Sequence, residues 1–103
     1  MSYIHASELP KGWEIIPDDK KKFFESELVN ELCSEHILFQ KDVQVLARKS
    51  DRDDFLFLID ELEKTLCVVH LTWSKETNPN WPSTTQFKDK EEFLKSWNEE
   101  LYE

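Results

Sequence analysis

The chain has 103 residues, of which 39% are hydrophobic and 13% aromatic, and it carries a formal net charge of −9. That length suits one domain with one core, expected over residues 1–103, and the aromatic content excludes a disordered chain. Most of the acidic excess lies in residues 51–103, which hold 13 Asp and Glu against 6 Lys and Arg. Such a surface repels nucleic acid and anionic lipid and favours a basic protein partner.

The start of the chain, MSYIHASELPKGWE, has no basic leader followed by an apolar run, and no segment nears the ~20 apolar residues of a membrane span. Cys33 and Cys67 are far apart, so neither a disulfide scaffold nor a zinc site is indicated. We therefore expect a cytoplasmic protein without cofactor or metal. Both cysteines should be small buried apolar side chains rather than nucleophiles.

The first predicted elements are an irregular or extended lead-in and a helix. Pro10, Gly12 and Pro17 break the segment ELPKGWEIIP, which should lay its apolar side chains against the core. A helix is predicted from Asp18 to about Cys33. It carries one broad apolar stripe at four-residue steps with its flanks, formed by Phe23, Phe24, Leu28, Val29 and Leu32. The following SEHILFQKD is apolar enough to lie against the domain.

Three strands are predicted next, in DVQVLARK, DFLFLID and TLCVVHLTW, joined by short polar turns of hairpin length. Strict alternation places Val43, Val45 and Ala47 on one face of the first strand. The second strand is apolar on both faces and should be central. A second helix is predicted from about Asp89, because Asp89 and Glu92 have the spacing of a capping box.

These elements predict an α+β fold: one domain with a three-stranded antiparallel meander, on which an N-terminal and a C-terminal helix pack. The predicted core contains one or two residues from most elements, namely Phe24, Leu28, Phe57, Val69, Phe93 and Trp97.

No catalytic motif is evident. His70 falls inside the third strand, and we expect it to be partly buried and hydrogen-bonded across the sheet. The single glycine, Gly12, argues against a phosphate-binding loop, and neither G-x-S-x-G nor H-E-x-x-H occurs. A small enzyme using His70 with a carboxylate remains the alternative function. An adaptor or structural subunit is a further one.

The acidic residues of the two hairpin turns are the candidate contacts for a basic partner. Those candidates are Asp51, Asp53, Asp54, Asp60, Glu61 and Glu63. The two turns lie at opposite ends of the meander, so one interface could use only one set.

The segment NPNWPSTTQF places Trp81 between two prolines. Pro79 and Pro82 restrict the backbone before them and reduce the entropy lost when the loop orders. The indole then has two possible places, the space between the sheet and the second helix or a partner's pocket. We expect the core position, since a small domain has little area to spare for an exposed indole.

The segment VVHLTWSKETNPNWPSTTQFKDKEEFL, residues 68–94, resembles the tail of small bacterial proteins of uncharacterised or toxin-immunity type. The shared elements are H-L-T-W at a strand end, W-P in the next loop and an aromatic residue before a short acidic helix. The resemblance implies an α+β domain encoded beside a toxin gene. Together with the charge, it predicts a non-enzymatic immunity protein that neutralises a basic toxin, for example a nuclease.

Overall fold

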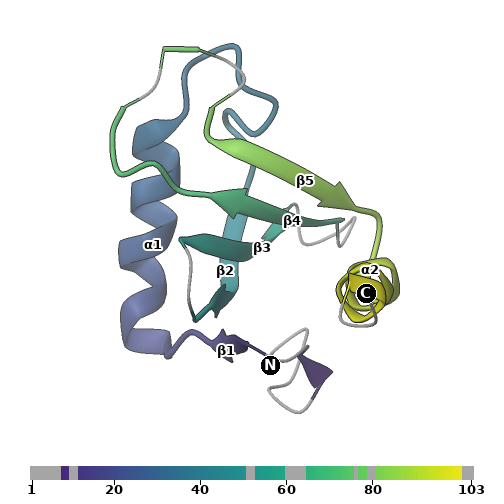
Figure 1. Cartoon of the computed structure of the whole chain (residues 1–103). Helices are drawn as coiled ribbons and strands as arrows, with labels where there is room; N and C mark the ends of the chain where they lie inside the picture. Colours follow the sequence, from purple (N-terminus) through teal and green to yellow (C-terminus); the bar gives the residue numbers. More distant parts are fainter. Residues whose placement is uncertain are drawn as a thin grey trace.

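A computed structural model of the chain describes residues 8–9, 12–50, 53–59, 65–75, 77–78 and 81–100, the side chains of residues 97–100 excepted. The strands form a single antiparallel sheet in which each neighbour in sequence is also a neighbour in space (Figure 1). In order across the sheet they are β1 (Trp13–Ile15), β2 (Val43–Lys49), β3 (Asp54–Ile59), β4 (Thr65–His70) and β5 (Ser83–Phe87). The predicted α+β class is confirmed, but the three-stranded meander is wrong because the sheet has five strands.

The two strands that sequence reasoning missed are the edge strands of the sheet. β1 has only three residues and lies in the segment predicted to be an irregular or extended lead-in, which was not recognised as a strand of the sheet. β5 reads STTQF, and apart from Phe87 its side chains are exposed or half-buried. A strand with little to bury shows no apolar alternation, so β5 was absorbed into the predicted loop.

The sheet buries both of its faces, and each helix covers one of them (Figure 1). α1 (Asp18–Glu31) packs Phe24 and Leu28 onto the face that includes Phe55 and Phe57. α2 (Lys90–Glu100) packs Phe93 onto the opposite face. β3 is buried along its whole length, as predicted for a central strand with two apolar faces.

A β-bulge in β2 changes which side chains face which helix. The register with β3 shifts between Val45 and Ala47. Val43 and Val45 therefore belong to the core beneath α1, whereas Ala47 belongs to the core beneath α2. The predicted common face for these three residues is wrong at Ala47, because one extra residue reverses the alternation.

The predicted stripe of α1 is too broad. Phe24, Leu28 and Leu32 are buried, but Phe23 and Val29 are 63% and 57% exposed. A helix turns by about 100° per residue, so Phe23 and Phe24 cannot both point at one flat sheet. The loop after α1 is similarly divided: Leu38 is buried and Ile37 is exposed.

The start of α2 confirms the predicted capping box. Asp89 Oδ1 accepts the Glu92 N–H at 2.9 Å, and Glu92 Oε1 accepts the Lys88 N–H at 3.2 Å. The buried core residues of the prediction are confirmed except for Trp97, whose side chain lies outside the described part. Neither described helix is long and apolar enough to cross a membrane.

Candidate protein-binding surface

The acidic candidates that the structure describes are Asp53 and Asp54, at the start of β3. Asp53 forms an ion pair with Arg48 at 3.3 Å, and its side chain is 41% exposed. Asp54 is buried, and its Oδ1 lies 2.8 Å from His70 Nδ1. Both carboxylates are thus already engaged within the protein. The other candidates lie outside the described residues: Asp51, Asp60, Glu61 and Glu63.

His70 occupies the position predicted for it. Its side chain is half exposed and contacts Asp54, its cross-strand partner in β3. An ionised carboxylate can only accept, so the hydrogen of this bond lies on Nδ1. The other cross-strand partner of His70 is Ser83 in β5, so an acid, an imidazole and a hydroxyl share one face of the sheet. Sequence reasoning named His70 and a carboxylate but could not identify the carboxylate without the strand register.

Trp81 does not plug the core. Its side chain is 45% exposed, and the predicted core position is therefore wrong. The peptide bond between Trp81 and Pro82 is cis. The loop is held instead by buried His36, whose Nδ1 accepts the Leu38 N–H and whose Nε2 donates to the Pro82 carbonyl, both at 3.0 Å. The residue that anchors this loop is thus a histidine from the loop after α1.

Two exposed aromatic side chains lie close together beside α1. Phe23 and Trp73 are 63% and 43% exposed, and their ring centroids are 6.3 Å apart with an angle of 31° between the planes. Beneath them lie Phe24 and Phe55, whose centroids are 6.4 and 6.3 Å from that of Trp73. We call these four residues the aromatic surface. Such clusters of rigid rings are typical of interface anchors.

Arg48 borders the aromatic surface from β2. Its guanidinium carbon lies 5.2 Å from the Phe55 ring centroid and 6.0 Å from that of Phe24. These distances are those of cation–π contacts. Asp53 pairs with the same guanidinium, so the position of Arg48 is determined from two sides.

The backbone of Trp73 is strained. Its φ is 62°, in the left-handed region that a bulky side chain rarely adopts. A residue in such a conformation costs on the order of 1–3 kcal/mol and persists only where its surroundings enforce it. Strained residues of this kind are concentrated at functional sites. Here the strained residue carries an indole that is exposed on the surface.

The enforcing residue is Glu31, the last residue of α1, which is fully buried. Its Oε1 accepts the Thr72 N–H at 2.9 Å and lies 3.0 Å from Thr72 Oγ1, while its Oε2 accepts the Trp73 N–H at 2.8 Å. Hydrogen bonds to a carboxylate are roughly twice as strong as those between neutral groups. The buried Glu31 side chain thus holds the turn that carries Trp73 through hydrogen bonds to two backbone N–H groups.

A second carboxyl group lies beside this one. A hydrogen bond to the Glu31 side chain, followed by burial and by the negative charge of Glu31, raises the pKa of Glu27 from 4.5 to about 7. The two residues are four apart on α1 and therefore adjacent on its surface. Near neutral pH the Glu27 carboxyl group is therefore still partly protonated, which lessens its repulsion with Glu31.

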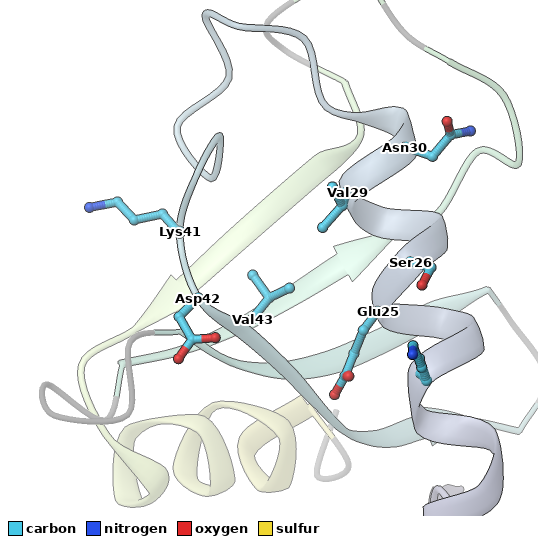
Figure 2. A pocket seen from close by; sticks show the side chains of 8 residues that line it. Glu25, Ser26, Val29, Asn30, Lys41, Asp42 and Val43 are labelled. Atoms are coloured by element: carbon cyan, nitrogen blue, oxygen red, sulfur yellow. The ribbon is translucent and has the colours of Figure 1, made fainter.

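An open groove runs between α1 and the start of β2 (Figure 2). Its volume is about 550 Å³, and it is lined by Lys22, Glu25, Ser26, Val29, Asn30, Lys41, Asp42 and Val43. A second hollow of about 620 Å³ adjoins Phe23 and shares Lys22, Ser26 and Asn30 with the groove. The groove and the aromatic surface are therefore connected across the exposed side of α1.

Sequence reasoning did not find this surface. It placed Phe23 in the apolar stripe of the first helix and Trp73 at the end of a strand. The available signal was the pair Phe23–Phe24, since two successive large apolar residues in a helix must point in different directions. Across the described part of the chain, no three His, Cys, Asp or Glu side chains are grouped to hold a metal ion.

Comparison of the chain with protein-family models, with curated proteins and with solved structures gives no match.

Proposed function

We propose that this protein acts by binding another protein and that the aromatic surface is its main contact. The observation that carries the proposal is Trp73, which is strained, exposed and held in place by a buried carboxylate. An indole without a role outside the fold would not require this arrangement. Exposing it also has a cost, because apolar surface in water is unfavourable by roughly 25 cal/mol per Å².

The partner's charge follows from that of this chain. A net charge of −9 attracts a basic protein over long range and speeds its association. The acidic residues need not form the final contacts for this effect. The aromatic surface would provide the affinity and the overall charge the rate of encounter.

The more specific proposal is a cytoplasmic immunity protein that neutralises a basic bacterial toxin, for example a nuclease. It is supported by the charge, by the exposed aromatic surface and by the resemblance of residues 68–94 to proteins of toxin-immunity type. Inhibition would then be steric: a bound domain of this size can cover the active site of a small enzyme.

The test is titration calorimetry between the purified chain and the basic effector encoded by the neighbouring gene. Phe23→Ala and Trp73→Ala should each weaken binding by at least ~2 kcal/mol, or about 30-fold, as interface anchors do. Ile37→Ala is the matched control, since Ile37 is 59% exposed but lies on the loop after α1. Equal losses in all three variants, or none, would reject the aromatic surface as the contact. A wild-type chain that does not bind the effector would reject the immunity role.

A second candidate function rests on the row of Asp54, His70 and Ser83 across three strands. His70, oriented by Asp54, could accept the Ser83 proton while the hydroxyl oxygen attacks an ester, as in other hydrolases. Hydrolysis of p-nitrophenyl acetate separates this candidate from the first. A wild-type rate no higher than that of His70→Ala would remove it.

A further inference from the structure

The outer edge of β2 is only partly covered. β1 pairs with β2 from Ala47 to Lys49. Ile16, the residue directly after β1, donates its N–H to the Leu46 carbonyl at 3.1 Å. One residue earlier in β2, the Val45 N–H donates to the Glu25 carboxylate at 2.9 Å. The backbone of Val45 therefore points away from β3, towards α1.

Val43 presents the next backbone groups on this edge. β2 pairs with β3 in regular register from Val43 to Val45. Residues two apart in a strand direct their N–H and C=O groups to the same side. The backbone groups of Val43 therefore also point away from β3, into the groove. A strand edge with unpaired N–H and C=O groups is a template for pairing with another extended chain.

The lining of the groove beside this edge includes two apolar side chains, Val29 and Val43, among polar and charged ones. Figure 2 shows Val29 on α1 and Val43 on β2 directed towards each other across it, whereas Lys41 points outwards. Val29 is 57% exposed, which is unusual for a valine on the side of a helix next to the sheet. The groove has a volume of about 550 Å³, within the range of ~300–1,000 Å³ that is typical of binding sites.

We propose that an extended segment of the basic partner adds to β2 as a further strand, pairing with Val43 and laying an apolar side chain against Val29. This inference rests on the proposed function, because it concerns how the same partner is held. The hollow beside Phe23 makes the groove continuous with the aromatic surface, so one partner can occupy both. Among the charged side chains that line the groove, Asp42 would attract a basic side chain of the added strand, whereas Lys22 and Lys41 would repel it.

Amide hydrogen exchange by NMR tests the pairing directly, with the full chain and the basic effector of the neighbouring gene. The Val43 amide should exchange rapidly in the free protein and at least tenfold more slowly in the complex. Val45 should change little, because Glu25 already accepts its N–H in the free protein.

Two variants test the site independently. Val43→Pro removes the outward donor at the first residue of β2, a strand position where proline is tolerated. Val29→Trp fills the groove from an exposed helix position, and Ile37→Trp is its matched control. Both groove variants should weaken binding at least tenfold, and the control should not. Thermal unfolding should be unchanged for Val29→Trp, which starts from an exposed side chain, and it serves as the measure of any loss that Val43→Pro causes in the core.

The outcomes separate this inference from the proposed function. If the effector binds and Trp73→Ala weakens it, but Val43 exchange and the Val29→Trp affinity are unchanged, strand addition is rejected and the aromatic contact stands. If the effector does not bind, both are rejected. If the Val43 amide becomes protected without effector as the protein concentration rises, the edge pairs with a second copy, and the proposed occupant is wrong.

Discussion

Replacing Glu31 by alanine should destabilise the protein and release Trp73. The change removes a buried carboxylate that accepts two backbone N–H groups at 2.9 and 2.8 Å and lies 3.0 Å from a hydroxyl. A donor left without a partner costs ~1–3 kcal/mol when buried. Thr72 is only half-buried and Trp73 is exposed, so water replaces part of the loss. Relief of the strain at Trp73 recovers about 1 kcal/mol more. The expected net loss is about 2–4 kcal/mol of unfolding free energy.

Urea unfolding measures this loss. With a slope of ~1.5 kcal/mol/M, a loss of ~3 kcal/mol lowers the midpoint by about 2 M. Glu31→Gln should lose about half as much, since its amide oxygen can still accept the Thr72 N–H while its NH₂ group faces the Trp73 N–H. Glu35→Ala, on the exposed loop after α1, is the control and should change the free energy by less than ~0.5 kcal/mol. If Glu31→Ala matches this control, or if its Trp73 indole resonance is unshifted, Glu31 does not hold the turn.

Four further outcomes are expected. Because the pKa of Glu27 is raised from 4.5 to about 7, its contribution to stability is complete below pH 4.5 and is lost as the pH rises to about 7. Glu27→Gln should remove that slope from a series of urea midpoints, and an unchanged slope would contradict the raised pKa. Trp81→Ala should lower the unfolding free energy by less than ~2 kcal/mol, well below the ~3–5 kcal/mol of a fully buried tryptophan. Burial raises the pKa of Cys67 to about 12, so a maleimide at pH 8 should label this thiol only after denaturation. Association with a basic effector, followed by stopped flow, should slow as salt is raised, because charges are screened over ~8 Å at physiological ionic strength; a salt-independent rate would contradict electrostatic steering.

The parts of the fold that sequence patterns predicted are those where local chemistry and burial agree. Asp89 and Glu92 specify the start of α2 by spacing alone. The double apolar pattern of β3 marks a central strand irrespective of the number of its neighbours. The cross-strand contact of His70 followed from its place in an alternating strand, although its partner, Asp54, required the register.

The errors have a common physical origin in long-range contacts. β5 is held by pairing with β4 and not by its own side chains, so its sequence carries no strand pattern. The bulge that moves Ala47 to the other core has no local signature. Trp81 was assigned to the core on the basis of its size, but the core beneath α2 is filled by Trp13, Phe87 and Phe93 from distant parts of the chain. The loop of Trp81 is instead held by His36, which lies 46 residues from its hydrogen-bond partner Pro82. Packing partners distant in the chain decided each of these cases.

α1 explains why the exposed aromatic residues and the open edge occur together. A helix that only covered a sheet would direct its apolar residues inwards and surround them with charge. α1 instead buries Phe24, Leu28 and the carboxylate of Glu31, and exposes Phe23 and Val29. Both polar side chains that it directs inwards end on backbone N–H groups: Glu31 fixes the turn of Trp73, and Glu25 occupies the β2 edge next to Val43. Two carboxylates of the helix thus bind the backbone of the elements that flank its exposed apolar residues. Exposing Phe23 and Val29 costs stability in the isolated chain, and under the proposed function a partner that covers both residues would offset that cost.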